Sequence, residues 1–309
     1  MRHALPTLSA AVLTCALACS LACAPVQAGT HAFTCDRQAD GLTAPPSWQN
    51  ATGAAAATAS YSEAERACWA DWAHARELAT GPDGLWVDVR DEGARRQLGL
   101  PGVAAADLAD VPARTFLWNQ SLVLIGTGVD LKALSQHCAA LRQSGQFKSV
   151  HVLLHGVRSW RQAGQPVQAG SALVPPDEIS AQEFWLGATQ GLWRVVTLGL
   201  DAQAQARLPQ PAAFAASTGD LPQAMDALAA RIAGASEDLS PQRWLVVAAS
   251  AAQLRRAQAW WRQQAVARNA ALPPVVWLSG AWPAYADYRQ HQQTLAAHAG
   301  RPLPRLCGL

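Results

Sequence analysis

The sequence has few charged residues and no block of one charge. Charged residues make up 15% of the 309 positions, and 24 Lys and Arg stand against 22 Asp and Glu, so the formal net charge at pH 7 is +2. No Lys/Arg run is interleaved with aromatic residues, as a nucleic-acid surface would require. This balance excludes nucleic acid and an anionic membrane surface as expected partners.

Long apolar runs are lacking after the N-terminal region. There, a short basic start precedes the apolar run Ala10–Cys23, and Val26-Gln27-Ala28 places small residues at the spacing that a signal peptidase prefers. The run is too short for a membrane-spanning helix. We therefore expect residues 1–28 to be a cleaved signal peptide and the mature chain to be a soluble periplasmic protein. Acylation of Cys23 is the alternative.

Clusters of metal-binding or cofactor-binding residues are also lacking. His137, His151 and His155 are scattered, and none has a second ligand at a suggestive spacing. Gly126-Thr127-Gly128 follows an apolar run, but the glycine spacing and acidic residue of a dinucleotide site are missing, as is a P-loop lysine. We expect no metal and no cofactor. The glycine segment is either a tight turn or an anion site formed by backbone N–H groups.

Four cysteines follow the predicted signal peptide: Cys35, Cys68, Cys138 and Cys307. An oxidising compartment permits disulfides, and four cysteines allow three full pairings. We predict a Cys35–Cys68 bond, because it would tie the irregular N-terminal segment to the first helix. A Cys35–Cys307 bond is the alternative. Cys138 lies in register with the leucines of its predicted helix and should face the core.

Strand-like and helix-like segments alternate in two similar halves. Each half runs helix, strand, loop, strand, helix, strand and glycine, which predicts a mostly parallel sheet flanked by helices and indicates a duplicated domain. Ser62 with Glu65, and Ser180 with Glu183, form capping boxes at helix starts. The predicted segments are a signal peptide (1–28), an N-terminal arm or linker (29–60), a first domain (61–170), a second domain (177–300) and a C-terminal tail (301–309).

The predicted elements can be given by residue number. Helices are expected at 62–78, 131–144, 179–184, 221–233 and 251–265, with a last helix through Tyr285 and Tyr288. Strands are expected at 85–90, 122–125, 150–154, 193–198, 244–247 and 275–278.

Several short motifs occur in a fixed order in the first half. Leu85–Arg90 ends in Asp-x-Arg, and the turn Leu100-Pro101-Gly102-Val103 follows it. Val152–Gly156 then precedes Trp160, and the tail Ala163-Gly164-Gln165-Pro166-Val167 completes the series. In this order the stretch resembles a rhodanese, and the second half resembles one loosely. The resemblance implies an α/β fold of two rhodanese-like domains, each a mostly parallel sheet flanked by helices, and a sulfurtransferase ancestry.

The resemblance also implies where the chemistry of the family would lie. An active rhodanese opens the loop after its central strand with a nucleophilic cysteine, whose thiolate needs electropositive surroundings. That loop here consists of Gly126, Thr127, Gly128, Val129 and Asp130, with Gly126 at the cysteine position and an acid at its end. The corresponding loop of the second half consists of Ala248, Ala249 and Ser250. Neither loop can form a persulfide, so we expect no catalytic residue in either.

Asp88 and Arg90 lie at the end of the first predicted strand. We expect them to brace the loop through charge-assisted hydrogen bonds; lining a cleft is the alternative.

Together these features favour a catalytically inactive sulfurtransferase homologue that acts as a binding or scaffolding protein, with an unidentified protein or small anion as partner. One alternative is a thiosulfate-type sulfurtransferase that uses a non-standard thiol or a sulfur-carrying partner. A redox role for Cys307 is another.

Overall fold

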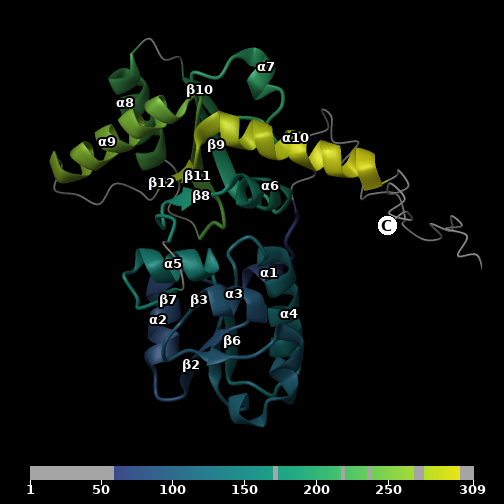
Figure 1. Ribbon diagram of the computed structural model, residues 1–309. Coiled ribbons are helices and arrows are strands. Elements are labelled where there is room, and N and C mark those ends of the chain that lie inside the picture. The colour runs from purple at the N-terminus through teal and green to yellow at the C-terminus, as the bar shows by residue number, and fades with distance from the viewer. Residues whose placement is uncertain (1–58, 170–172, 217–219, 235–238, 268–274, 300–309) are drawn as a thin grey trace, which may run out of the picture. The chain divides into compact units, whose positions relative to one another are not determined.

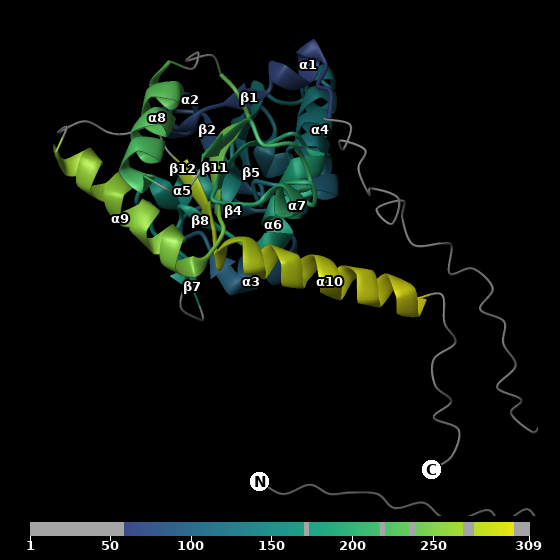
Figure 2. The same cartoon turned by 90° about the horizontal axis from the view of Figure 1, so that it is seen from above.

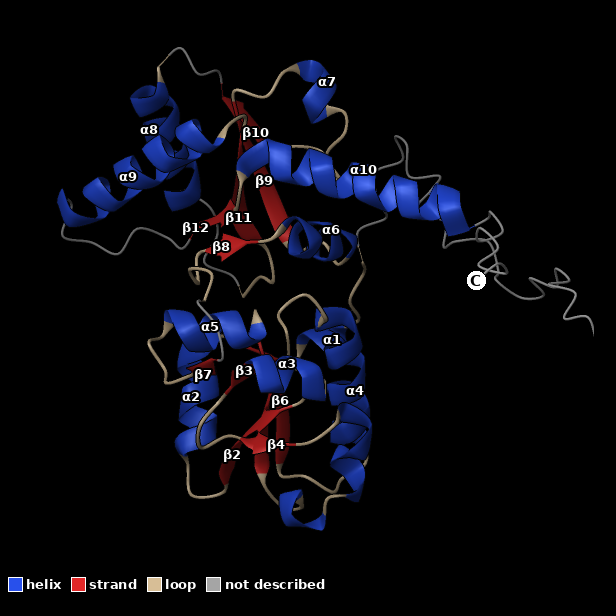
Figure 3. Cartoon of the chain, in the orientation of Figure 1, coloured by secondary structure: helices blue, strands red, loops and turns tan. Residues whose placement is uncertain are grey.

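Two five-stranded sheets form the centre of the structure, which is a computed structural model (Figures 1 and 3). Both sheets belong to one compact unit, Leu42–Arg301. The residues described are 59–169, 173–216, 220–234, 239–267 and 275–299. The predicted signal peptide, most of the predicted arm, the C-terminal tail, Cys35 and Cys307 lie outside these residues.

The first half of the chain contains two layers of helices around one sheet. Its helices are α1 (Glu63–Arg66), α2 (Trp72–Thr80), α3 (Glu92–Gln97), α4 (Leu131–Gln143) and α5 (Gly156–Gln162), with 3₁₀ turns η2 (Leu108–Ala113) and η3 (Thr115–Leu117). Its strands are β1 (Trp69–Ala70), β2 (Gly84–Asp88), β3 (Leu98–Gly99), β4 (Ala104–Ala105), β5 (Ser121–Ile125), β6 (Ser149–Leu153) and β7 (Gln168–Ala169).

The first sheet has the strand order β1-β6-β5-β2-β4, and each pair of neighbours is parallel. Successive residues of β5 point to opposite faces, as in any strand. Leu122 and Leu124 therefore pack with α4, while Val123 and Ile125 pack with α2 and α5. Because both faces are covered, β5 is a continuous apolar run rather than an alternating one. A separate antiparallel pair joins β3 to β7.

The second half of the chain repeats this layering. Its helices are α6 (Ala181–Thr189), α7 (Ala202–Gln205), α8 (Leu221–Ala233), α9 (Ala251–Ala267) and α10 (Ala281–Ala299). Its strands are β8 (Glu178–Ile179), β9 (Trp193–Leu198), β10 (Phe214–Ala216), β11 (Arg243–Ala248) and β12 (Val275–Leu278). Helices α8 and α9 lie on one face of the sheet, and α6 and α10 lie on the other (Figures 1 and 2).

The two sheets share one topology. The second sheet has the order β10-β9-β11-β12-β8 and is also parallel throughout. Numbered from one to five within its own half, each sheet reads 1-5-4-2-3 from one edge to the other. The predicted α/β fold with two mostly parallel sheets is confirmed, and the common strand order supports its origin by duplication.

The helix predicted from Ser62 through Leu78 is wrong in its extent. The capping box of Ser62 and Glu65 forms, but α1 ends at Arg66. The next residues form β1, which pairs with β6 and buries Trp69. Pairing and burial in the sheet outweigh the local preference for helix there. The other predicted helices and strands overlap observed ones, and α8, β9 and β12 have the predicted bounds, whereas α3, α5 and α7 were not predicted.

The predicted Cys35–Cys68 disulfide is also wrong. Cys68 is bonded to Cys138, with an S–S distance of 2.14 Å and a Cα–Cα distance of 6.2 Å. Cys68 immediately precedes β1, and Cys138 lies on the face of α4 that covers the same sheet. Both are fully buried, which confirms that Cys138 faces the core. Because β1 pairs with β6, Cys68 lies beneath α4 and next to Cys138. This contact joins residues far apart in the sequence, so the local sequence pattern does not reveal it.

We expect loss of this bond to destabilise the first half. A variant with both Cys68 and Cys138 replaced by alanine should lose about 2 to 4 kcal/mol of unfolding free energy, because the bond closes a long loop. The sequence separation of the two cysteines is 70 residues. Urea unfolding of wild type and variant measures the loss. An unfolding midpoint of wild type that is the same with and without reductant would contradict the prediction.

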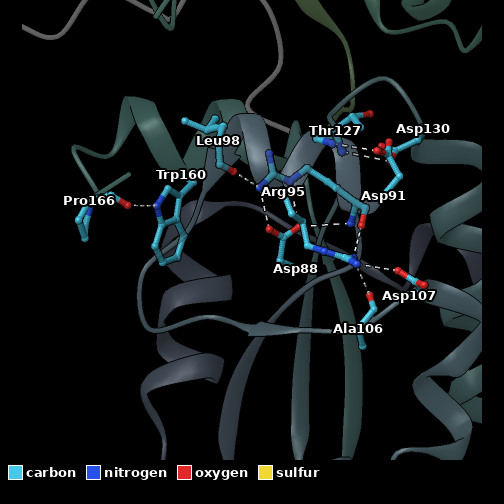
Figure 4. Close-up of polar contacts among 12 residues, drawn as sticks. Asp88, Asp91, Arg95, Leu98, Ala106, Asp107, Thr127, Asp130, Trp160 and Pro166 are labelled. Atoms are coloured by element: carbon cyan, nitrogen blue, oxygen red, sulfur yellow. Dashed lines mark hydrogen bonds and ion pairs between the residues drawn. The ribbon is translucent and has the colours of Figure 1, made fainter. Parts of the chain in front are cut away.

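Three tryptophans gather on the α2 face of the first sheet. Trp72 and Trp86 are stacked, with ring centroids 5.5 Å apart and an interplanar angle of 14°. Trp160 meets both rings edge-on, at 6.0 Å and 5.3 Å. Its indole N–H donates to the carbonyl of Pro166 at 3.0 Å (Figure 4). The polar edge of a buried indole thus has a partner, and the chain after α5 is tied to this face.

Candidate functional site

The candidate site lies where β2, β5 and β6 end. Parallel strands place their carboxyl ends at one edge of a sheet, which is where α/β proteins bind ligands. Asp88, the last residue of β2, is in register with Ile125, the last residue of β5. The loop of residues 126–130 follows Ile125 and leads into α4. The predicted loop is therefore at the expected edge, next to Asp88.

The carboxylate of Asp130 occupies the inside of this loop. Its Oδ2 accepts a hydrogen bond from the backbone N–H of Thr127 and its Oδ1 one from that of Gly128, both at 3.1 Å (Figure 4). The hydroxyl of Thr127 in turn accepts from the N–H of Val129 at 3.3 Å. Three successive loop amides are thus satisfied by side chains of the loop itself. An external anion would have to displace a carboxylate to reach them.

Gly126 has no room for a side chain. A Cβ atom at this position would lie 2.3 Å from Leu134 Cδ1 and 2.7 Å from each carboxylate oxygen of Asp130. Both neighbours are side-chain ends, so they can move, but Leu134 is a buried core residue. A cysteine here would require Asp130 and Leu134 to shift together. The position where the resemblance places a thiol is therefore filled.

The first turn of α4 is capped by the second half of the chain. The N–H of Lys132 donates to Oε1 of Gln190 at 2.9 Å, and the hydroxyl of Tyr61 donates to the Gln190 carbonyl at 3.1 Å. The Lys132 ammonium binds both carboxylate oxygens of Glu65 at 2.6 and 2.7 Å. Free N–H groups at a helix start favour anions. Here Gln190 takes one of them.

The chain after β6 closes against the loop. His155 and Gly156 both have left-handed backbone, with φ of 64° and 52°. The N–H of Val157 donates to the Gly126 carbonyl at 3.0 Å. A Cβ atom at Gly156 would lie 2.2 Å from the same oxygen, so only glycine fits this approach.

Asp88 and Arg90 form a buried, two-point ion pair. The Arg90 Nε and Nη2 atoms donate to the two carboxylate oxygens of Asp88 at 2.9 and 2.6 Å, and both residues are less than 5% exposed. Arg90 Nη2 also donates to the carbonyl of Leu98 at 2.6 Å. Arg95 continues the network, donating to the carbonyl of Arg90 and to Asp107 (Figure 4). The network ties the segment after β2 to the edge of the sheet, and none of these hydrogen bonds reaches residues 126–130.

The corresponding loop of the second half is closed in a similar way. Ala248 ends β11, and Ala249 and Ser250 lead into α9. The N–H of Ala249 is directed to the Leu198 carbonyl at 2.9 Å and to Oε1 of Gln253 at 3.2 Å. The Ser250 hydroxyl accepts from the N–H of Gln253 at 3.3 Å. In both halves a side chain from the start of the following helix occupies the loop.

Comparison with known proteins gives likenesses in fold. No family model matches the chain, and no curated protein matches it. A Rhodanese_3-like domain of the Alr3790 protein from Anabaena sp. is 23% identical, over 29% of this chain and 97% of that one, with a TM-score of 0.25. A rhodanese-related protein from Thermoplasma volcanium is 17% identical, over 32% and 96%, with a TM-score of 0.26. The chain is similar to rhodanese-like domains.

The chain is also similar to a protein that is not described as a rhodanese. A Rhodopseudomonas palustris protein of unknown function, described as a possible tyrosine phosphatase, is 22% identical over 34% of this chain and 89% of that one, with a TM-score of 0.27. At these values the likeness says nothing of substrate or reaction, so function has to be argued from the site.

Two kinds of feature are absent from the residues that the structure describes. Within the described residues, no three His, Cys, Asp or Glu side chains are grouped to hold a metal ion. The described part of the chain also contains no helix long and apolar enough to cross a membrane. What the loop offers is a set of backbone N–H groups already bonded to Asp130, next to the buried pair of Asp88 and Arg90.

Sequence reasoning missed two contributors to this edge of the sheet and the hydrogen bonding of a third. Gln190 and Gln253 were not singled out, and Asp130 was named only as the acid at the end of the loop. Asp130 accepts from the N–H groups of residues two and three positions before it, so these hydrogen bonds are local in the sequence. The contact of Gln190 joins residues 58 positions apart, so the local sequence does not indicate it.

Proposed function

We propose that the chain is an exported, catalytically inactive relative of the rhodanese-type sulfurtransferases that acts as a binding or scaffolding protein. The hydrogen bonding of Asp130 carries the proposal. A loop that transfers sulfur must direct free N–H groups at an anionic sulfur, whereas the amides of Thr127 and Gly128 already donate to a carboxylate. The loop holds its own anion where a substrate anion would bind.

The cysteines support the same proposal. The cysteines among the described residues, Cys68 and Cys138, are bonded to each other and buried, so neither offers a thiolate. A buried structural disulfide also favours an oxidising compartment, which supports export to the periplasm.

Sulfur transfer by the full chain tests the proposal. We expect thiocyanate formation from thiosulfate and cyanide to stay at the uncatalysed rate for wild type. We expect the same for Gly126→Cys, because the new Cβ meets Leu134 and Asp130. A triple variant, Gly126→Cys with Asp130→Ser and Leu134→Val, removes both obstacles and frees the amides of Thr127 and Gly128. Mass spectrometry should then detect one added sulfur atom on Cys in the triple variant alone.

The matched control is Ala73→Cys, which places a thiol on the exposed face of α2, away from the loop. If a persulfide forms on this control as readily as on the triple variant, the loop does not promote persulfide formation. Turnover by wild type would overturn the proposal and favour a sulfurtransferase that uses another thiol.

A further inference from the structure

The outward face of α9 carries three arginines. From residue 255 on, the exposed positions that the structure describes lie within about 120° of the helix circumference, since successive residues are about 100° apart. They are Arg255, Arg256, Ala259, Arg262, Gln263 and Val266. The opposite face packs on the second sheet through Leu254, Ala257 and Trp261, beside α8 (Figure 2). One side of α9 is therefore in the core, and the other is exposed.

The charges of Arg255, Arg256 and Arg262 are not compensated by carboxylates. Helix α9 contains no Asp or Glu. Within the described residues, none of the three guanidinium groups forms an ion pair. Arg262 donates to the carbonyl of Gln258 in its own helix at 3.3 Å. By contrast, the exposed Arg114 has a carboxylate partner four residues away. Three positive charges therefore face solvent along one side of one helix.

Two apolar side chains accompany these arginines. Val266 is 82% exposed, and Trp260, four residues after Arg256, is only partly buried against the sheet. Arginine and tryptophan are the residue types that most often carry the binding energy of protein interfaces. Anionic membranes are bound instead by clusters of about four to eight Lys and Arg. The face therefore fits the carboxylates of a protein better than a lipid surface.

We propose that the exposed face of α9 is a docking surface for an acidic segment of a partner protein. Guanidinium groups bind carboxylates through two parallel hydrogen bonds, so each of the three arginines can hold one acidic side chain. Arg255 and Arg262 are about 10 Å apart along the helix axis, at about 1.5 Å per residue. An extended segment of about four residues spans that distance. The inference rests on the proposed role as a binding or scaffolding protein and names the chemistry of its partner.

A fluorescently labelled peptide of eight glutamates tests the surface on the full chain, with fluorescence anisotropy as the readout. Wild type should bind the peptide at low ionic strength and lose affinity as NaCl is added, because salt screens exposed charges. The triple variant Arg255→Gln, Arg256→Gln and Arg262→Gln should bind about tenfold more weakly, the combined effect of three exposed ion pairs. The corresponding triple lysine variant keeps the charges and should retain part of the affinity.

The matched control is Arg76→Gln with Arg96→Gln and Arg114→Gln. It removes three exposed arginines from the first half and lowers the net charge by the same amount. Its peptide affinity should be close to that of wild type. An equal loss in the control and in the α9 variant would overturn the proposal, because attraction would then follow net charge alone. Wild type that does not bind the peptide at low ionic strength would overturn it as well.

A photoreactive group on the peptide locates the site without any protein variant. Cross-links to wild type, identified by mass spectrometry, should fall within Ala251–Ala267. Cross-links concentrated on other elements would contradict the assignment to α9.

Vesicles of phosphatidylglycerol and phosphatidylcholine distinguish a membrane from a protein partner. Wild type should not sediment with them at an ionic strength at which it binds the peptide. Sedimentation that the α9 variant loses, without peptide binding by wild type, would replace the acidic segment with a lipid surface and overturn the proposal. Thiocyanate formation by wild type would overturn the proposed function but leave peptide binding intact, so the two failures are distinguishable.

Discussion

Replacing Asp88 with alanine is expected to lower the free energy of unfolding by about 3 to 5 kcal/mol, the cost of leaving a buried charge without its partner. Arg90 would keep its hydrogen bond to the Leu98 carbonyl but lose both contacts to the carboxylate. Its guanidinium is too buried to be solvated in exchange, with 4% of the residue exposed. The same change should loosen the segment that Arg95 holds against the carbonyl of Arg90. Denaturant unfolding at low temperature measures the loss.

Asp110→Ala is the matched control. It removes an ion pair of the same type, Asp110 with Arg114, whose side chains are 53% and 50% exposed. An exposed pair of this kind contributes about 0 to 1 kcal/mol. A double variant, Asp88→Ala with Arg90→Met, should be more stable than Asp88→Ala alone, since it removes the orphaned charge as well. Similar losses for Asp88→Ala and Asp110→Ala would contradict the prediction.

Replacing Gly156 with alanine is expected to destabilise the protein by about 3 to 5 kcal/mol, because two costs combine. The first is conformational, since the φ of 52° lies in the left-handed region that L side chains rarely adopt. The second is steric: the new Cβ would lie 2.2 Å from the Gly126 carbonyl oxygen and 2.8 Å from the Gly128 nitrogen. Both atoms belong to backbone and cannot rotate away. The 126–130 loop and α5 would have to separate, with loss of the hydrogen bond from Val157 to Gly126.

Gly164→Ala separates the two costs. Gly164 has a φ of 69°, yet nothing lies within 4 Å of a Cβ placed there. The Gly164→Ala variant should therefore lose only the conformational part of the unfolding free energy, about 1 to 2 kcal/mol. Amide hydrogen exchange of residues 126–130 should accelerate in Gly156→Ala and stay unchanged in Gly164→Ala. Equal losses of unfolding free energy in the two variants would show that the contact between the 126–130 loop and α5 does not contribute to stability.

The periodic elements could be predicted from sequence because their signals are local. The apolar face of Met225, Leu228 and Ile232 predicted α8 with its observed bounds. The buried run Val275–Leu278 did the same for β12. The position of the 126–130 loop followed from the strand before it and the helix after it. These are properties of neighbouring residues, which a single sequence contains.

Long-range contacts decided what could not be predicted. Trp69 continues a helical pattern in sequence, but in the fold it pairs with Val152 of β6. That pairing also brings Cys68 to Cys138, which no spacing rule selects from three connectivities. The capping of α4 by Gln190 depends on how the two halves meet. The role of Asp130 could be predicted only in part. Its hydrogen bonds to the loop are local, but the lack of space for a side chain at Gly126 also depends on Leu134.

The tryptophan cluster of the first half should contribute to the far-ultraviolet circular dichroism, as should the second group formed by Trp260, Trp261 and Trp277. Trp72 and Trp86 are stacked with nearly parallel rings, close enough for their transition dipoles to couple, and Trp160 lies edge-on to both. Coupled indoles produce a paired band in the far-ultraviolet circular dichroism that vanishes once the rings separate. Trp160 follows Gly156 by four residues on α5, so displacement of that helix should change the band before the sheet unfolds. The difference between the spectra of wild type and Gly156→Ala, in which the contribution of the second group cancels, reports on the position of α5 without any label.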